Sequence, residues 1–579
     1  MSKLNIDQKT IETFFSDPKT DFLIPDYQRP YAWTETECRT LWDDIFSFAF
    51  PENNSDNFKA TDEYFLGPIV TFKNNTGKLE IIDGQQRLTT LMLLLRAFYA
   101  RFGKMKDGGT QLVQERVEKC IWKKDELGAI IKTQLKIDSE VATDIQKDQF
   151  LSILKTGDAP DAMKSQYAVN YRFFQEKINE FLNDYPTYFA YLPARLMNNC
   201  ILLPIEAESQ DTALRIFSTL NDRGMPLSDS DIFKAQFYKF YSSLGKKDEF
   251  ISRWKALEER CNSIFHPSIG SPMDELFSRY MYYERALLGI RNTTTEALRK
   301  FYEKNSYALL KKEQTFDNLI DLADFWNDVA DQNVDRFSER ILRKLFVLNY
   351  APNGMWCYFV SVYYLHNRDK NGDLDDNAFY VFLDKMIAFI WAYAVTRPGV
   401  NLLRGPVYTE MVNIVNDKPI SFSENKFDLS SVKKAFENFS FNNGRPITKS
   451  MLAWWAFFNN KQELLSINTT FEIEHIYPKS RQEKEHSLTS TKNIEALGNK
   501  TLLEKNINIR ASDYRIKDKK KYYLGYTNSK GQEKKGTKIQ ELLTLASEKN
   551  DYLENDIIER TEYIINSFLD YLTQNGLSQ

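Results

Sequence analysis

The chain is predicted to be an α+β protein in which helices predominate, and three stretches of the sequence support this prediction. Residues 1–110 mix short β-rich runs with helical runs, residues 247–460 follow long amphipathic helical patterns, and the C-terminal part returns to short elements bounded by polar residues. A chain of 579 residues exceeds what one hydrophobic core usually organises, because domains commonly hold about 100–200 residues. We therefore predict a mixed α/β domain over residues 1–243, a helical connector over 244–445 and a small C-terminal domain over 446–579.

Composition narrows the class of protein. Lys and Arg number 76 against 80 Asp and Glu, a net charge of -4, so any nucleic-acid binding must come from local clusters of basic residues. The five cysteines are scattered without a CxxC pair, which argues against a disulfide framework or a thiolate zinc site. The first ten residues lack an apolar signal core, and the longest apolar run, residues 88–100, is interrupted by Arg96. We expect a cytoplasmic protein without membrane contact.

The N-terminal elements follow from caps and breaks in the sequence. Thr34 and Glu37 form a capping-box pattern, which predicts a helix over the following turns. Residues 65–72 and 78–82 are short β-rich runs on either side of Asn-Asn-Thr-Gly, as in a hairpin. After an Asp-Gly break, residues 86–102 have a strongly helical pattern.

Further elements are predicted along the next part of the chain. Residues 112–192 are predicted to be helical and connective, residues 200–205 a buried strand and residues 211–220 a helix. The cluster Ser-Asp-Ser-Asp that begins at Ser228 can cap another helix, which we expect to end near Tyr241. The aromatic stripes of the long middle helices are interpreted as core packing, and no functional motif occurs among them.

Four polar residues in the C-terminal domain are ordered as in a ββα-metal site. Glu474 and His475 lie in a short β-like run, Asn499 follows His475 after 24 residues, and Asn508 lies nine residues later in a helical stretch. In such an order a first strand presents a base, the return of the hairpin presents an orienting amide, and the helix presents a metal ligand. A Glu-His pair alone on a strand is usually structural, so the combination with both asparagines carries the prediction.

The chemistry of phosphodiester hydrolysis explains why these residue types belong together. Hydrolysis requires an activated water and a cation that neutralises charge on the phosphate and on the leaving oxygen. A neutral histidine can accept the proton of water near pH 7, and carboxylate and amide oxygens suit Mg²⁺ or Mn²⁺. We therefore predict that His475 is the general base and that Glu474 and Asn508 are metal ligands. Asn499 is predicted to serve catalysis by holding the histidine or the loop around it.

Basic residues are concentrated downstream of these four positions. Residues 515–538 hold nine basic and two acidic side chains, interleaved with tyrosines. A chain with a near-neutral total needs such local charge to bind phosphates. A solvated loop-and-helix face explains the same composition, and this alternative stays open.

The segment IIDGQQR, residues 81–87, lies at a predicted strand–turn–helix junction. Glycine permits a tight turn, a helix start offers N–H groups to anions, and arginine adds a planar cation, so the segment suits a phosphate group. The nucleotide-binding residues that we predict are Asp83, Gly84, Gln85, Gln86 and Arg87. A capped helix start explains the same segment equally well. The chain contains no GxxxxGK[ST] and no GxGxxG pattern, so any nucleotide site would differ from a P-loop.

Two further polar segments are candidates for the same pocket. The loop YQRPY, residues 27–31, combines aromatic rings with a cation and could stack on a base, although an ordinary buried loop is the alternative. A polar turn and the helix after it form the second candidate, in which Asp231 and Lys234 share a helix face, and a salt-bridged surface is its alternative. The residues that we predict to sense DNA or nucleotide are Tyr27, Gln28, Arg29, Tyr31, Asn221, Arg223 and Lys234.

Together these motifs resemble those of the GmrSD-type modification-dependent (type IV) restriction endonucleases, a group that includes the phosphorothioate-sensing SspE-like proteins. The N-terminal resemblance rests on YQRPYAW (27–33), IIDGQQRLTTL (81–91) and FSTLNDRGMPLSDSDIFK (217–234). The C-terminal resemblance rests on IEHIYPKS (473–480) and LGNKTLLEKNIN (497–508).

The resemblance implies a ParB/sulfiredoxin-like N-terminal domain and a C-terminal HNH (His-Me finger) nuclease domain. It implies that His475 and Asn499 serve cleavage, and that hydrolysis of an NTP, either GTP or ATP, regulates the cutting of modified phage DNA by proteins that often self-associate. Two positions depart from the common pattern, because Glu474 replaces an aspartate and Asn508 replaces the histidine of many HNH sites. For nucleotide binding and hydrolysis the resemblance implies Asp83, Gln85, Gln86 and Arg87.

The sequence therefore predicts an enzyme: an NTP-regulated endonuclease, dependent on Mg²⁺ or Mn²⁺, that cuts modified double-stranded DNA and forms a homodimer. Two alternatives stay open. One is a DNA- or nucleotide-binding sensor whose nuclease site is inactive, and the other is a toxin-like nuclease that acts on host nucleic acid.

Overall fold

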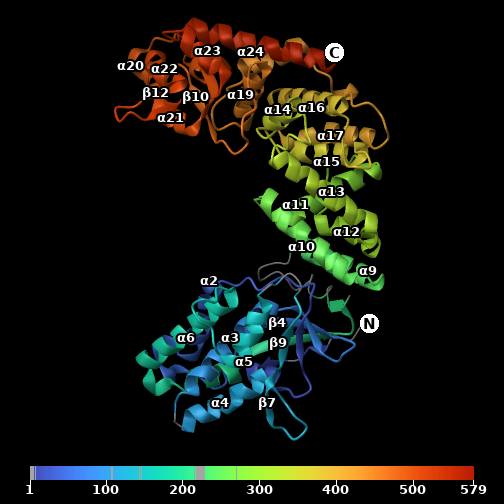
Figure 1. Ribbon diagram of the computed structural model, residues 1–579, viewed down its shortest axis with the longest axis vertical. Helices are drawn as coiled ribbons and strands as arrows, with labels where there is room; N and C mark the ends of the chain where they lie inside the picture. Colours follow the sequence, from blue (N-terminus) through green and yellow to red (C-terminus); the bar gives the residue numbers. More distant parts are fainter. Residues whose placement is uncertain are drawn as a thin grey trace. The chain divides into compact units, whose positions relative to one another are not determined.

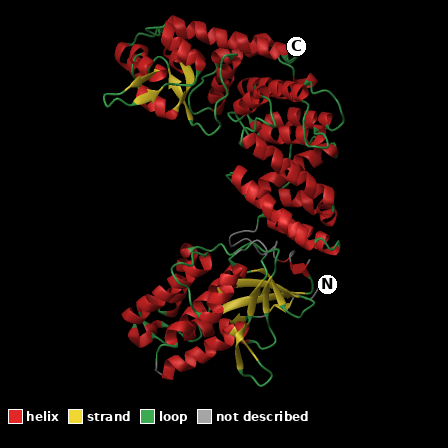
Figure 2. Cartoon of the chain, viewed as in Figure 1, coloured by secondary structure: helices red, strands yellow, loops and turns green. Residues whose placement is uncertain are grey.

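The computed structural model describes residues 5–6, 8–105, 108–141, 144, 146–210, 212–213, 216, 228–268 and 270–579. The chain forms two compact units, Met1–Ala256 and Leu257–Gln579 (Figure 1). Helices predominate in both units and strands are few, which confirms the predicted α+β class (Figure 2). The second unit contains both the predicted C-terminal domain and most of the predicted helical connector.

The first unit is built on a seven-stranded mixed sheet with the order β1-β9-β4-β5-β3-β8, in which β2 also pairs with β9. Strand β4 runs parallel to β9 and antiparallel to β5, whereas β3 runs parallel to both β5 and β8. The strands of this sheet are β1 (Asn5–Ile6), β2 (Lys9–Thr10), β3 (Phe22–Ile24), β4 (Tyr64–Lys73), β5 (Leu79–Asp83), β8 (Ile137–Ser139) and β9 (Cys200–Ala207). A separate hairpin consists of β6 (Trp122–Lys124) and β7 (Ile130–Leu135).

Helices pack on this sheet around one large hydrophobic core, in which α3 is buried along nearly its whole length (Figure 1). The helices are α1 (Ile11–Ser16), α2 (Glu35–Ala49), α3 (Gln85–Phe102), α4 (Gly108–Ile121), α5 (Lys147–Thr156), α6 (Gln166–Asp184), α7 (Tyr191–Asn199) and α9 (Asp229–Ser243). Helix α10 (Lys247–Ile264) contains the boundary between the two units. The capping box predicted at Thr34 and the helix cap predicted at Ser228 are both present. The predicted hairpin, helix 86–102 and strand 200–205 are confirmed by β4–β5, α3 and β9.

The prediction that residues 112–192 are helical and connective is wrong in part. Besides helices, this stretch holds the β6–β7 hairpin and strand β8, which joins the edge of the main sheet beside β3. Strand β8 has only three residues, and its partner β3 lies more than a hundred residues earlier, so tertiary pairing and not local pattern fixes its conformation. The predicted helix 211–220 lies largely outside the described residues.

The second unit begins as a stack of helices, as predicted for the middle of the chain (Figure 1). The helices that follow α10 are α11 (Pro272–Leu287), α12 (Leu298–Tyr307), α13 (Glu313–Ala330), α14 (Glu339–Leu348), α15 (Met355–Asn367), α16 (Asp376–Thr396), α17 (Val400–Ile414), α18 (Leu429–Asn438) and α19 (Pro446–Phe458). Aromatic side chains fill their contacts; Trp326 and Trp391, for example, are both buried. By length and composition α16 could cross a membrane, but 67% of its apolar window is buried in the protein, as in the core helix of a soluble protein.

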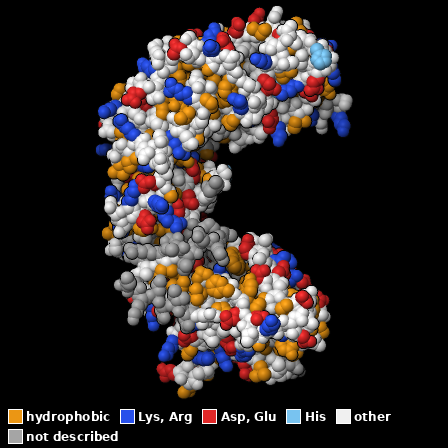
Figure 3. Space-filling view, turned by 180° about the vertical axis from the view of Figure 1, so that it is seen from behind, with side chains coloured by type: hydrophobic (Ala, Val, Ile, Leu, Met, Phe, Trp, Pro, Cys, Tyr) orange, Lys and Arg blue, Asp and Glu red, His pale blue; other side chains and the backbone are white. Residues whose placement is uncertain are grey.

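The C-terminal part of the second unit adds two short hairpins and several helices. Its elements are β10 (Phe471–His475), α20 (Lys479–Glu485), β11 (Lys500–Glu504), α21 (Lys505–Ala511), α22 (Ile516–Leu524), β12 (Gly525–Thr527), β13 (Glu533–Lys535), α23 (Gln540–Glu548) and α24 (Glu554–Gln574). On the face of the molecule in Figure 3, Lys and Arg side chains are interspersed with Asp and Glu side chains, as the near-neutral net charge requires. All five cysteines are free, as predicted.

Candidate active site

The C-terminal candidate residues lie on a β-hairpin followed directly by a helix. Glu474 and His475 end β10, where they pair with Thr501 and Lys500 of the antiparallel strand β11. Helix α21 follows β11 without a break and packs against both strands. The sequence predicts the base on a strand, the orienting amide on the return of the hairpin and a metal ligand on a helix. The structure places His475, Asn499 and Asn508 in that order, with Asn499 in the turn just before β11.

The imidazole of His475 has a ring nitrogen, Nε2, that is buried without a hydrogen-bond partner among the described residues. Burial, together with the nearby cations Lys500 and Lys479, lowers the pKa of this imidazole to about 4. The ring is therefore neutral at pH 7, the state that can accept a proton from water. An unpartnered buried nitrogen is costly, about 1–3 kcal/mol, so a proton donor or a cation that reached this nitrogen would offset the cost.

In the metal-free protein we expect His475 to stay neutral until the pH falls to about 4. Its usual pKa of 6.5 applies to the unfolded chain, so between pH 6.5 and 4 only the unfolded chain takes up the proton. The free energy of unfolding should therefore fall as the pH drops through this window, and the loss should be complete below about pH 4. An NMR titration of the ring protons, assigned by comparison with His475→Ala, measures the pKa of the imidazole in the folded protein. A midpoint near 6.5 would contradict the burial of the ring.

Asn499 holds the backbone that follows His475. The side chain is fully buried, its Oδ1 accepts from the N–H of Tyr477 at 2.7 Å, and its Nδ2 donates to the carbonyls of Tyr477 and Ile494 at 3.1 Å each. Its backbone carbonyl accepts from the N–H of Ile476 at 2.9 Å. These contacts are with the loop around the histidine and not with the imidazole.

Glu474 lies in a different environment from its neighbour, because successive residues of a strand point to opposite faces. Its Oε1 accepts from Lys519 Nζ and from Tyr523 Oη, each at 2.6 Å. All three side chains are buried, and Lys519 also donates to the carbonyl of His475 at 2.8 Å. Burial raises the pKa of Glu474, whereas Lys519 and Tyr523 act to lower it. The predicted metal ligation by Glu474 stays a prediction, and the contacts present are those of an ion pair.

Asn508 is half-buried on α21, between Ile507 and Ala511, which anchor the helix. Its side chain makes no hydrogen bond within the described part of the chain, so its amide oxygen is available to a cation. Among the described residues no group of three or more His, Cys, Asp or Glu side chains is placed to hold a metal ion. A cation at this position would therefore take few protein ligands. That suits Mg²⁺, which keeps several waters and binds substrate phosphates.

Sequence reasoning missed the residues that support these groups. Lys519 and Tyr523 belong to the basic segment 515–538 interpreted as phosphate-binding, yet both are buried against Glu474. Residues four apart share one face of a helix, but this spacing does not indicate that the face is buried. Gly498 is a second missed position: a Cβ there would lie 2.0 Å from the carbonyl oxygen of Ile557, so helix α24 can pack on this turn only if residue 498 is glycine.

The rest of the basic segment lies on the surface. Its exposed cations are Lys517, Lys521, Lys530, Lys535 and Lys538. Tyr514 and Tyr522 stack with ring centroids 6.2 Å apart and 15° between planes, and Tyr526 meets Tyr522 edge-on at 5.4 Å. Exposed lysines beside stacked aromatic rings form a surface suited to a phosphate backbone.

In the first unit the DGQQR segment forms the expected strand–turn–helix junction. Gly84 has φ 89°, and a Cβ there would lie 2.3 Å from Ile69 Cδ1, so glycine is required. Arg87 donates to the carbonyl of Pro68 at 3.0 Å. Burial raises the pKa of Asp83, whereas its bond from the N–H of Gly84 and the nearby cations Arg87 and Arg29 lower it. The structure thus brings Asp83, Arg87 and Arg29 together at the start of α3.

The glutamines of this segment bind the preceding loop instead of facing solvent. Gln86 accepts from the N–H groups of Ala32 and Trp33 at 2.7 and 3.2 Å and donates to the carbonyl of Pro30 at 3.1 Å. Gln85 donates to the carbonyl of Arg29 at 3.2 Å. Both glutamines are buried, and their contacts fix the loop that carries the YQRPY sequence.

The candidate sensing residues are also mainly engaged within the fold. Gln28 donates to the carbonyls of Ile81 and Ile82. The hydroxyl of Tyr31 forms hydrogen bonds with Thr90 and Asn170. The hydroxyl of Tyr27 donates to Glu80 at 3.3 Å. Lys234 is buried on α9, where Asp231 completes the helix cap. The predicted residues Asn221 and Arg223 lie outside the described residues.

Comparison with known proteins follows the same division of the chain. The N-terminal domain of the GmrSD restriction endonucleases matches residues 11–238, and the C-terminal domain of the GmrSD restriction endonucleases matches residues 427–567. The uncharacterized protein MJ0686 of Methanocaldococcus jannaschii is 21% identical over 339 residues, which cover 55% of this chain and 52% of that protein. The chain thus spans about half the length of that relative.

Both candidate sites, the DGQQR junction and the β10–β11–α21 site, lie within the matched regions. The chain belongs to the GmrSD family of restriction endonucleases, as the sequence motifs predicted.

Proposed function

We propose that the protein is a cytoplasmic, divalent-metal-dependent and NTP-regulated endonuclease that cuts modified foreign DNA. One observation carries the proposal: a buried, neutral and unpartnered imidazole nitrogen at the end of β10, in a loop held by Asn499, beside the helix that carries Asn508. Membership of a restriction endonuclease family supports DNA as the substrate. The strand–strand–helix order supports an HNH (His-Me finger) site.

Each residue of the site has a separate role in this proposal. His475 accepts the proton of the attacking water. Asn508 would hold Mg²⁺ or Mn²⁺ together with water and phosphate oxygens, and such a cation neutralises charge on the phosphate and on the leaving oxygen. Asn499 keeps the loop after His475 in place, and the exposed lysines of segment 515–538 bind the DNA backbone.

We propose that the first unit is a ParB/sulfiredoxin-like domain that binds GTP or ATP at the DGQQR junction. Support comes from the mixed sheet, the glycine-dependent turn and the two arginines, Arg29 and Arg87, that face Asp83. Arginine presents a fork of donors that matches phosphate oxygens. Gln85 and Gln86 shape this pocket through the loop that they hold, and they serve the nucleotide indirectly.

Cleavage of defined DNA substrates tests the proposal. Modified and unmodified linear duplexes are incubated with the protein, with Mg²⁺ or EDTA, and with or without GTP or ATP. We expect cutting of a modified duplex only with the cation, and a change in its rate when the nucleotide is added. Asn508→Ala should raise the Mg²⁺ concentration for half-maximal rate by at least about 10-fold, the lower end of what loss of a partner beside a metal costs.

Asn506→Ala is the matched control, because Asn506 is exposed on the same helix. Equal Mg²⁺ requirements for both variants would exclude Asn508 as a ligand. Tight DNA binding without cleavage under any of these conditions would instead identify a sensor with an inactive site. The engagement of Glu474 by Lys519 is the observation that favours this alternative.

A further inference from the structure

Helix α24 packs on the candidate nuclease loop, where Thr561 accepts from the N–H of Gly498 at 3.0 Å and Arg560 binds several of the loop carbonyls. Arg560 donates from Nη1 to three carbonyl oxygens, those of Leu497, Gly498 and Lys500, at 3.0, 3.0 and 2.9 Å. These carbonyls surround Asn499 in the sequence, and Lys500 is the register partner of His475 in the hairpin.

The same guanidinium is fixed from its other side. Its Nε and Nη2 donate to the two carboxylate oxygens of Glu541 on α23, at 2.7 and 2.8 Å. Glu541 also accepts from the indole N–H of Trp455 on α19 at 2.7 Å. A bidentate arginine–carboxylate pair of this kind is directional, so the position of Glu541 determines where Nη1 points.

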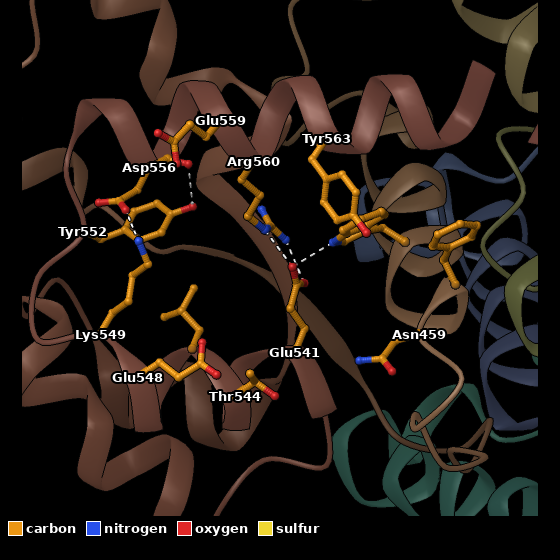
Figure 4. A pocket seen from close by; sticks show the side chains of 13 residues that line it. Asn459, Glu541, Thr544, Glu548, Lys549, Tyr552, Asp556, Glu559, Arg560 and Tyr563 are labelled. Atoms are coloured by element: carbon orange, nitrogen blue, oxygen red, sulfur yellow. Dashed lines mark hydrogen bonds and ion pairs between the residues drawn. The ribbon is translucent and has the colours of Figure 1, made fainter. Parts of the chain in front are cut away.

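A cavity of about 600 Å³ opens beside this ion pair (Figure 4). It lies between α19, α23 and α24, and Arg560, Glu541 and Trp455 form part of its lining. Figure 4 shows Arg560 reaching from α24 to Glu541 on α23, with Thr544 and Glu548 farther along that helix. Arg560 therefore lines a cavity that is large enough for a small solute.

We infer that Arg560 is a positioning residue of the nuclease site, and that Glu541 and Trp455 orient it from the cavity. The inference rests on the proposed function, because the loop that Arg560 holds is that of Asn499 and His475. The three hydrogen bonds from the guanidinium of Arg560 fix the position of this loop relative to β10. They thereby fix the orientation of Asn499 toward Tyr477. Small displacements of a reacting group cost large factors in rate, about 10²-fold for 1 Å.

Kinetics of Arg560→Ala separate positioning from simple stability. We expect the turnover number to fall about 10²-fold while the dissociation constant for DNA stays within about twofold, since the guanidinium is bound to Glu541 and to the loop carbonyls. Guanidinium at millimolar concentration should enter the cavity and recover most of the lost rate, whereas urea, which has the same shape without charge, should not. Arg560→Lys keeps the charge opposite Glu541 and should show a smaller loss.

Arg343 provides the matched control. It also donates to three backbone carbonyls, those of Phe457, Asn459 and Gln462, which do not belong to the nuclease loop. Arg343→Ala should lower stability without changing the turnover number of the folded fraction, and guanidinium should not alter its rate. Equal losses of turnover in the two alanine variants would overturn the inference.

Hydrogen exchange gives a readout that needs no cleavage. The amides of Ile476 and Tyr477 donate to Asn499, so their protection reports on the loop directly. Arg560→Ala and Arg560→Lys should each lose protection at these two amides, and Arg343→Ala should not. Unchanged protection overturns the inference even if the protein cuts DNA, and lost protection supports it even if the protein does not.

Discussion

Replacement of Glu474 by alanine is expected to lower the free energy of unfolding of the second unit by about 3–5 kcal/mol, the usual cost of breaking a buried ion pair from one side. Lys519 and Tyr523 are almost fully buried, and Glu474 accepts a hydrogen bond from each. Without the carboxylate, an ammonium group and a phenol would remain in the interior, with only the carbonyl of His475 left to accept from Lys519.

Urea unfolding followed by tryptophan fluorescence measures this loss. Glu474→Gln retains an acceptor and should lose less, and the pair Glu474→Leu with Lys519→Met should recover much of the loss, because it removes both charges together. If Glu474 is also a metal ligand, Glu474→Ala should in addition raise the cation concentration that half-maximal binding requires. A destabilised variant with unchanged cation binding would show that the ion pair is its only role.

Much of the fold could be predicted because its signals are local. The capping boxes at Thr34 and Ser228, the hairpin break between β4 and β5, and the length of α3 all depend on residues a few positions apart. Strand β8 could not be predicted this way. It has three residues, and it is extended because it pairs with β3, which the sequence around it does not indicate.

The candidate nuclease site was predictable to a similar degree. The order of His475, Asn499 and Asn508 indicated a strand, its return and a helix, and the structure has these elements in that order. The partners of these residues were not predictable, because Lys519, Arg560 and Glu541 reach the site from helices that follow it in the chain. Charged side chains on amphipathic helices are usually solvated, so only tertiary packing shows which of them are buried.

The DGQQR segment illustrates the same limit at the other end of the chain. Its glycine was correctly interpreted as a turn with close backbone approach. Which of its side chains face a ligand could not be predicted, because the two glutamines satisfy backbone groups of a loop more than fifty residues earlier. Buried backbone groups must be paired, and these glutamines pair them.

His475→Ala is expected to have the largest effect on activity. Loss of a good general base costs about 10²–10⁴-fold in rate, and the Nε2 atom of His475 has no partner among the described residues that would hold it away from a water. Stability should change little or improve, because the substitution removes a buried nitrogen that lacks a partner. His486→Ala is the matched control, since His486 is exposed at the end of α20 and makes no contact with the site.

The most direct test of a neutral imidazole acting as base is a single-turnover cleavage rate, measured in saturating Mg²⁺ on a modified duplex that the wild-type protein cuts. The rate is compared among wild type, His475→Ala and His486→Ala. We expect a wild-type rate for His486→Ala and a fall of at least about 10²-fold for His475→Ala, with DNA binding retained. Equal cleavage by His475→Ala and wild type would show that His475 is not the general base.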